Sequence, residues 1–293
     1  MLRLGVNLPT FDPLRLGGPP RFIETARLAE QAGLDAVWVG DHLRMPTPNH
    51  DATVALAAVA ASTTKVGLGF AVMLLGLRQP PWAAKQLTTI DALAPGRLRL
   101  GVGVGGEFPE EFEALGLSTS RRGRLLDDAL AQLPGWLDGS STPSLAPTIS
   151  QLPPIYVGGR GEPALQRAAR VGDWWLPTWL TPDKLRERMT QLNELAAHAD
   201  RPTPRLALAL SVHVDADEGL ARQRASEYTE GMYGMPFERV ERYTPTGSAA
   251  RVAEQIAAYA EAGVEELVLT PLTGDPLEQV ERLALVRELC SGR

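Results

Sequence analysis

Two short stretches of the sequence have a titratable side chain directly after an apolar segment that is predicted to be a strand. Asp41 and His42 follow the segment 35–39, and Glu107 follows the glycine-rich segment 97–106. A histidine beside a carboxylate can take up and release a proton near neutral pH, and a carboxylate at the end of a strand can act as a second acid or base. His42 and Glu107 are therefore candidate catalytic residues. Two structural alternatives stay open: a pair that only ties down a loop, and an exposed loop carboxylate.

A glycine-rich turn follows the segment 155–158 and suggests a phosphate-binding site. Gly158, Gly159 and Arg160 precede a predicted helix at 163–171. Glycines let backbone N–H groups approach an anion, and a helix N-terminus adds a favourable dipole. Arg122, at the start of another predicted helix, could supply a second cation, although a solvated basic turn explains it equally well.

A second glycine-rich segment contains Gly-x-Gly-x-x-Gly at Gly101, Gly103 and Gly106. This spacing alone suggests a dinucleotide-binding turn, but such a turn is followed at once by a helix and lies on the first strand of its fold. Here Glu107 and Pro109 interrupt the pattern on what is predicted to be the fourth strand. We therefore interpret Gly103, Gly105 and Gly106 as small residues that leave room for a flat ring, and keep a Rossmann dehydrogenase as an alternative.

Other kinds of catalytic site find little support. No H-x-x-x-H or paired Cys/His motif is present, and the pairs 110–111 and 127–128 are typical of solvated helix faces, so no metal site is expected. There is no G-x-S-x-G motif, and the single cysteine, Cys290, is near the C-terminal end. His213, at the end of a predicted strand, stays open as a further lining residue.

Composition limits the classes of partner. The 293 residues are 44% hydrophobic and 22% charged, which is typical of a folded globular chain. A net charge of −6 without a long basic run argues against nucleic-acid binding. The apolar runs are too short to span a bilayer, no signal peptide is recognised, and one cysteine fits a reducing compartment, so we expect a cytoplasmic protein.

The elements that must position these residues repeat one pattern of helix, glycine and short apolar strand. It occurs around Gly33, Gly96, Gly172 and Gly263. Eight strands are expected, and they begin near Leu2, Asp35, Lys65, Arg97, Pro154, Asp173, Leu206 and Glu265. Helices are expected at 21–31, 50–62, 81–92, 121–137, 163–171, 182–198, 250–262 and 277–289.

This alternation over one chain predicts a single (β/α)8 TIM barrel domain spanning residues 1–293. The polar segment 215–246 is an insertion between strand 7 and its helix, and its part 220–232 is compatible with an extra helix. We expect the insertion on the C-terminal rim, where barrel active sites are built.

Three segments resemble the luciferase-like monooxygenase superfamily, most closely its branch that uses the deazaflavin coenzyme F420. They are AGLDAVWVGDH, LGFAVMLLGLRQPPWAAKQLTTIDALAPGRLRLGVGVGGEFPEEFEALG and PPIYVGGRGEPALQRAARVGDWWLP. The similarity runs from the first strand to about residue 177 and resumes weakly near the C-terminus. It implies a barrel with a flavin or deazaflavin ring across its C-terminal mouth.

The resemblance also implies roles for particular residues. Several members have a non-proline cis peptide bond that supports the ring, and the matching step is Ala71-Val72. Asp41 and His42 match an acidic residue and a histidine after the second strand, the histidine being catalytic in some members. Glu107 lies at or beside a catalytic glutamate of the sugar-phosphate dehydrogenases. Residues 158–160 match the phosphate-side loop.

Two departures from the family pattern concern the substrate side. Gln79 stands where relatives often have a histidine, and an amide cannot titrate. The connection 138–153 is shorter than in many relatives. A homodimer is implied by the resemblance alone.

The predicted function is an oxidoreductase that moves a hydride between coenzyme F420 and a small organic substrate. One alternative on the same fold is an FMN-dependent monooxygenase using reduced flavin and O₂. Another is a non-catalytic flavin-binding protein.

Overall fold

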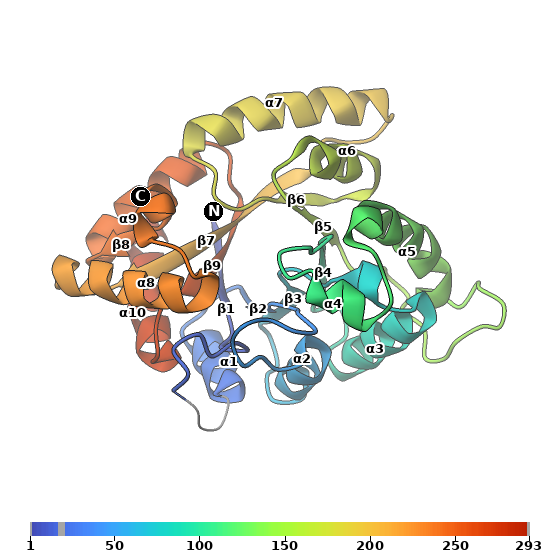
Figure 1. The fold of residues 1–293 in the computed structure, drawn as a ribbon, viewed down its shortest axis with the longest axis horizontal. Helices are drawn as coiled ribbons and strands as arrows, with labels where there is room; N and C mark the ends of the chain where they lie inside the picture. Colours follow the sequence, from blue (N-terminus) through green and yellow to red (C-terminus); the bar gives the residue numbers. More distant parts are fainter. Residues whose placement is uncertain (1, 17–20, 292–293) are drawn as a thin grey trace.

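Parallel strands close into a barrel in the computed structural model (Figure 1). Within residues 2–16 and 21–291, which the structure describes, eight strands pair in the order β1-β2-β3-β4-β5-β6-β7-β9, and β9 pairs again with β1. Their bounds are β1 Arg3–Asn7, β2 Ala36–Val39, β3 Gly67–Phe70, β4 Leu98–Val102, β5 Ile155–Gly158, β6 Trp174–Leu176, β7 Arg205–Val214 and β9 Glu266–Pro271. The short strand β8 (Thr246–Gly247) lies outside the ring beside β7. The predicted (β/α)8 barrel is confirmed.

Helices cover the outside of the ring, as expected for strands buried on both faces. The main ones are α1 Phe22–Gln31, α2 Ala52–Ala60, α3 Pro80–Leu93, α5 Arg122–Leu137, α6 Glu162–Val171, α7 Pro182–His198, α9 Ala249–Glu261 and α10 Pro276–Ser291. Several begin at a side-chain cap that accepts a backbone N–H, for example Asp51 before α2, Thr181 before α7 and Ser248 before α9.

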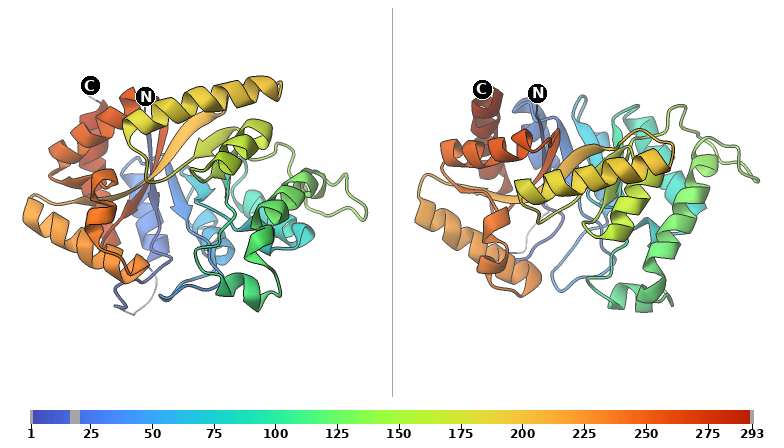
Figure 2. Two further views of the ribbon diagram at one scale, coloured as in Figure 1. Left: turned by 45° about the horizontal axis from the view of Figure 1, so that its top comes forward. Right: turned by 90° about the horizontal axis from the view of Figure 1, so that it is seen from above.

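The insertion after β7 folds as predicted. Its main helix is α8 (Glu218–Tyr233), which is followed by single turns η3 (Phe237–Arg239) and η4 (Glu241–Tyr243) and then by β8. A further short helix, α4 (Glu110–Ala114), follows β4, and two more single turns are η1 (Leu75–Leu77) and η2 (Thr119–Arg121). In Figure 2, α4 and α8 extend beyond the same end of the barrel, opposite the chain termini. Both elements can therefore reach the mouth.

Two local expectations need correction. The third strand was predicted over 65–73, whereas β3 covers only Gly67–Phe70, and a cis peptide bond between Ala71 and Val72 follows it. Gly33, Gly96 and Gly263 have the positive φ of a helix-ending glycine, whereas Gly172 has φ −82°. A Cβ at Gly172 would lie 2.9 Å from the Ala168 carbonyl oxygen, so close packing explains this glycine better.

Large side chains fill the amino-terminal half of the barrel interior. The indole of Trp38 is fully buried over Gly5 and Gly69, where a Cβ would come within 2.4 and 2.0 Å of the ring. Beside it, the buried carboxylate of Glu266 accepts hydrogen bonds from Arg99 and from the hydroxyl of Tyr156. This packing fills the barrel interior on the side of the amino ends of the strands.

We predict that Gly101→Ala destabilises the fold by about 2 kcal/mol or more, because overpacking of this kind forces backbone to move. A Cβ at Gly101 would lie 1.9 Å from the carbonyl oxygen of Phe70 on the neighbouring strand. Urea unfolding followed by circular dichroism measures the loss. The matched control is Gly123→Ala in α5, where the nearest atom is an Arg167 nitrogen at 3.5 Å. The control should gain up to about 1 kcal/mol from helix propensity. Equal stability of the two variants would contradict the prediction.

Candidate active site at the barrel mouth

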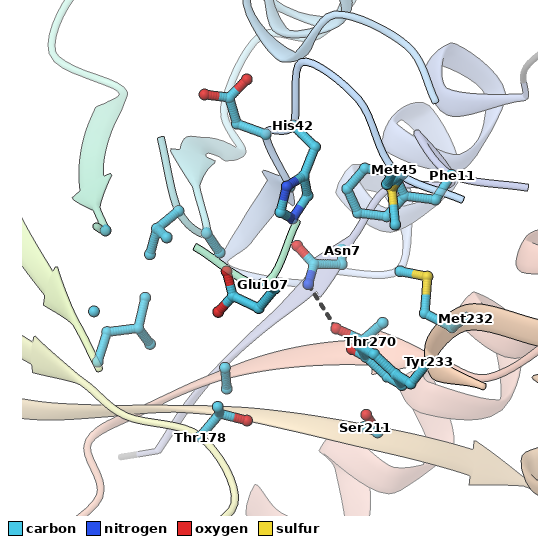
Figure 3. Close-up of a pocket in the computed structure, with 18 of the residues that line it drawn as sticks. Asn7, Phe11, His42, Met45, Glu107, Thr178, Ser211, Met232, Tyr233 and Thr270 are labelled. Atoms are coloured by element: carbon cyan, nitrogen blue, oxygen red, sulfur yellow. Dashed lines mark hydrogen bonds between the residues drawn. The ribbon is translucent and has the colours of Figure 1, made fainter. Parts of the chain in front are cut away.

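A cavity of about 390 Å³ opens at the carboxyl ends of the strands (Figure 3). Every strand of the ring contributes to its lining, directly or through the residues that follow it, and α8 forms one wall. The lining includes the predicted residues Asp41, His42, Ala71, Val72, Gly103, Gly105, Glu107, Gly158 and Gly159. This is the end of a TIM barrel where catalytic groups are found.

Asp41 binds an arginine that the sequence analysis did not single out. Its carboxylate accepts two hydrogen bonds from the Arg78 guanidinium, at 2.6 and 2.9 Å, and a third from the backbone N–H of Leu74 at 2.8 Å. Asp41 is only 4% exposed, so this pairing compensates a buried charge. The interaction ties the loop after β2 to the chain after β3. Arg78 lies next to Gln79, and of these two residues only Gln79 was named in the comparison with the family pattern.

His42 is held by a second buried carboxylate. Its Nδ1 lies 3.1 Å from Oε2 of Glu111, and the other oxygen of Glu111 accepts the backbone N–H groups of Leu43 and Arg44 at 2.7 and 3.2 Å. The contact favours a proton on Nδ1, which leaves Nε2 available to a ligand. Figure 3 shows the ring directed into the cavity.

The prediction that the pair 110–111 forms a solvated helix face is wrong for Glu111, which is fully buried. Helix α4 packs against the loop after β2 and brings this carboxylate to three donors. Its neighbour Glu110 remains exposed. A signal was present in the sequence, because consecutive residues of a helix point in different directions.

Aromatic rings restrict His42 from two sides. The imidazole centroid lies 5.1 Å from the ring of Phe108 in an edge-on arrangement and 6.0 Å from the ring of Phe11. Together with Glu111, these contacts leave the histidine few orientations.

The cis peptide bond implied by the family resemblance is present at Ala71-Val72. The Val72 side chain lies in a space left by two glycines: a Cβ at Gly103 or Gly158 would come within 2.3 or 2.9 Å of its methyl groups. The expectation that Gly103 leaves room directly for a ring therefore needs revision. The glycine accommodates Val72, and Val72 in turn lines the cavity.

Glu107 lies at the rim of the cavity and is exposed. Desolvation, together with the charge of Glu107, raises the pKa of Tyr233. Gly105 and Gly106, which precede Glu107, both have positive φ, and the turn carries the carboxylate to the mouth.

The predicted phosphate-side residues split into two groups. Gly158 and Gly159 line the cavity, and the Trp175 indole holds their loop by donating to the Gly159 carbonyl at 2.8 Å. Arg160 lies outside the lining with its guanidinium 5.4 Å from the centre of the Trp179 ring. Arg122 also lies outside and donates to the Thr119 carbonyl at 3.0 Å.

His213 does not line the cavity. Its Nδ1 donates to the Leu272 carbonyl at 2.8 Å, and burial lowers the pKa of the imidazole. The lining residues that sequence reasoning missed include Asn7 and three members of the insertion, Tyr228, Met232 and Tyr233. For Tyr228, Met232 and Tyr233, the only signal in the sequence was the expected position of the insertion on the rim.

Two other kinds of feature are not found in the part of the chain that the structure describes. No group of three or more His, Cys, Asp or Glu side chains could hold a metal ion. No described helix is both long enough and apolar enough to cross a membrane.

Comparisons with known proteins agree with this geometry. The family model described as luciferase-like monooxygenase matches residues 2–240. An F420-dependent glucose-6-phosphate dehydrogenase of Beutenbergia cavernae is 32% identical, over 97% of this chain and 96% of its own. An uncharacterized protein of Mycobacterium tuberculosis is 27% identical, over 73% of this chain and 84% of its own.

Solved structures share the fold. An F420-dependent secondary alcohol dehydrogenase, solved with an F420-acetone adduct, has a TM-score of 0.84 at 17% identity and covers 99% of both chains. The oxygenating constituent of 3,6-diketocamphane monooxygenase from Pseudomonas putida, solved with FMN, has a TM-score of 0.78 at 19% identity. That comparison covers 100% of this chain and 98% of the other.

We predict that Glu111→Ala lowers the free energy of unfolding by about 3 kcal/mol, because buried donors lose a charged acceptor. The matched control is Glu110→Ala on the same helix. Glu110 pairs with Arg44 at 3.4 Å, but both side chains are more than half exposed. The control should therefore cost less than about 1 kcal/mol. Urea unfolding measures both values, and a similar cost for the two would exclude the structural role of Glu111.

We also predict that His213 makes a pH-dependent contribution to the free energy of unfolding. Its pKa is lowered in the folded state, whereas the unfolded chain takes up the proton near the usual pKa of about 6.5. The contribution is present above that pKa and is lost as the pH falls below it. Urea unfolding at about pH 7.5 and 5.5 should show a smaller loss of stability for His213→Asn than for wild type. Identical pH dependence in the two proteins would refute the prediction.

Proposed function

Because a family model spans most of the chain, the protein belongs to the luciferase-like monooxygenase family, and we propose that it is an oxidoreductase using the deazaflavin coenzyme F420. The observation that carries the proposal is the cavity at the barrel mouth, with Val72 in its floor and His42 directed into it. The relative from Beutenbergia cavernae, which is named as F420-dependent, matches nearly the whole chain and supports the choice of cofactor.

The residues at the mouth fit a flat ring that carries a phosphate-bearing tail. Ala71, Gly103 and Gly158 have small side chains or none, so few atoms project into the cavity from this side. Gly159 has φ +113°, and its loop leads into the N-terminus of α6, where backbone N–H groups favour an anion. The tail would be held there, with Arg160 and Arg122 as nearby cations. The ring would be held by residues 71–72 and 103–105, beside Asp41.

When bound, F420 supplies the acceptor or donor of the hydride. The chain contributes the handling of the proton and the orientation of the substrate. His42 presents Nε2 to the cavity, so it can take the proton from a hydroxyl group or return it to a carbonyl oxygen. Glu111 holds the opposite edge of the imidazole and keeps Nδ1 protonated. Glu107, at the rim, is a second acid or base.

An FMN-dependent monooxygenase is the second candidate. The specific observation in its favour is the similarity to the FMN-bound oxygenating constituent from Pseudomonas putida. That similarity is below 25% identity and concerns the fold. We therefore rank this candidate second.

We also propose that the chain forms a homodimer through the face of α2 and α3. Val54, at the start of α2, and Trp82, at the start of α3, are 69% and 71% exposed, and the two helices pack against each other. These two exposed apolar side chains are compatible with a contact between proteins on this face, and the homodimer itself is implied by the family resemblance.

We predict that His42→Ala lowers kcat by about 100-fold or more, because general acid and base groups usually contribute at least that much. The affinity for F420, measured by fluorescence titration, should change by less than about threefold, since the proposal gives His42 no role in holding the cofactor. His198→Ala is the matched control and should keep full activity. Tight binding of FMN together with no binding of F420 would refute the proposed function.

A further inference from the structure

One side of the cavity is an apolar wall. It is built by the loops after β1 and β2, by the chain after β4 and β6, and by the inner face of α8. Its members are Phe11, Met45, Phe108, Trp179, Tyr228, Met232 and Tyr233. The same side chains belong to one hydrophobic cluster that includes the fully buried Phe237, apart from Tyr233, which packs edge-on against Trp179. The wall is therefore supported from behind and keeps its shape.

The described part of the lining carries no permanently charged cation. Among the described residues that line the cavity, none is lysine or arginine. Its acidic members are Asp41, whose charge Arg78 compensates, and Glu107 at the rim. A phosphorylated substrate would leave water for a site with an apolar wall and a carboxylate, without the charge-assisted hydrogen bonds that phosphates need.

One residue of the lining, Asn7, has a buried polar atom without a hydrogen-bond partner. Asn7 donates from Nδ2 to the Thr270 hydroxyl at 2.6 Å, whereas its Oδ1 is buried and has no hydrogen-bond partner. If the amide is rotated by about 180°, Oδ1 faces the Thr270 hydroxyl, and Nδ2 is then the atom without a partner. Figure 3 shows Asn7 and His42 directed into the same space. A buried polar atom without a partner costs free energy, which a ligand with a matching hydroxyl or carbonyl group would recover.

We propose that the substrate is a neutral, mainly apolar molecule with one hydroxyl or carbonyl group, and that the chain does not use sugar phosphates. The polar group binds at Asn7 and His42, and the apolar body packs against the wall formed by α8 and its neighbours. This inference rests on the proposed function, because the site is the same. It separates the chain from the relative named as a glucose-6-phosphate dehydrogenase, despite the 32% identity between them.

The first test uses the F420-loaded wild-type protein. Calorimetry measures the binding of 1-phenylethanol, 2-octanol, glucose and glucose 6-phosphate, and loss of the visible absorbance of F420 measures turnover. The two apolar alcohols should bind at least about tenfold more tightly than either sugar, as expected for a difference of one or two well-buried apolar groups. Equal or tighter binding of glucose 6-phosphate, or no binding of either alcohol, would overturn the inference.

The second test changes the wall. Met232→Arg adds a cation to it and should weaken 1-phenylethanol binding by about tenfold while improving glucose 6-phosphate binding. Gln223→Arg adds the same charge to the exposed outer face of α8, where Gln223 contacts Glu227, and should change neither affinity. Equal effects of the two substitutions on alcohol binding would overturn the inference.

The third test concerns the polar anchor. Asn7→Ala should weaken 1-phenylethanol binding by about fivefold, which is typical of one lost neutral hydrogen bond. Binding of ethylbenzene, which has the same body without the hydroxyl, should change less than twofold, by the same reasoning. Parallel losses for both compounds would refute the role of Asn7.

The affinity for F420, measured for every protein, distinguishes a failure of the proposed cofactor from a failure of the proposed substrate class. Wild-type protein that fails to bind F420 would refute the proposed function. Normal F420 binding with a preference for glucose 6-phosphate would refute only the substrate class.

Discussion

The close approach of the chain after β3 to β4 and β5 is the constraint on which the barrel mouth depends. It is possible only because β4 and β5 present glycine there: Gly101 faces the Phe70 carbonyl, and Gly103 and Gly158 make room for Val72. Side chains at these three positions would push the third strand outward. The floor of the cavity would then lose its shape, and the residues that follow β2 and β3 would lose the contact that brings them together.

Two buried carboxylates fix the loops at the barrel mouth through hydrogen bonds. Asp41 and Glu111 bind backbone N–H groups as well as side chains, so each fixes the course of a loop, and Arg78 compensates the charge of Asp41. Such groups are costly to bury alone and stabilise one geometry when every partner is in place. The loop after β2 contains His42 and contacts both carboxylates, so the orientation of the histidine depends on both interactions.

The order of elements followed from local patterns, whereas the partners of the site residues did not. Helix α7 was predicted over 182–198 and has these bounds, because its Thr-Pro start and apolar spacing are contained in one segment. Glu111 was misjudged, since its burial depends on His42, which is 69 positions away. Arg78 was overlooked for the same reason, as Asp41 lies 37 positions before it. Contacts over such distances leave no periodic signal in one sequence.

The mouth divides into a floor made by strands and a wall made largely by loops and the insertion, and the two differ in how freely they can change. Floor positions are constrained by backbone atoms of neighbouring strands, as at Gly101. Of the strands in the ring, helix α8 contacts mainly β7, and its other main contacts are with β8 and η3 of the insertion, so its inner face can change with less disturbance to the ring. Overall identity to a relative is therefore a better guide to what lies on the floor than to what packs against the wall. Tyr228 and Met232, on that inner face, line the cavity without the backbone constraint that fixes the floor positions.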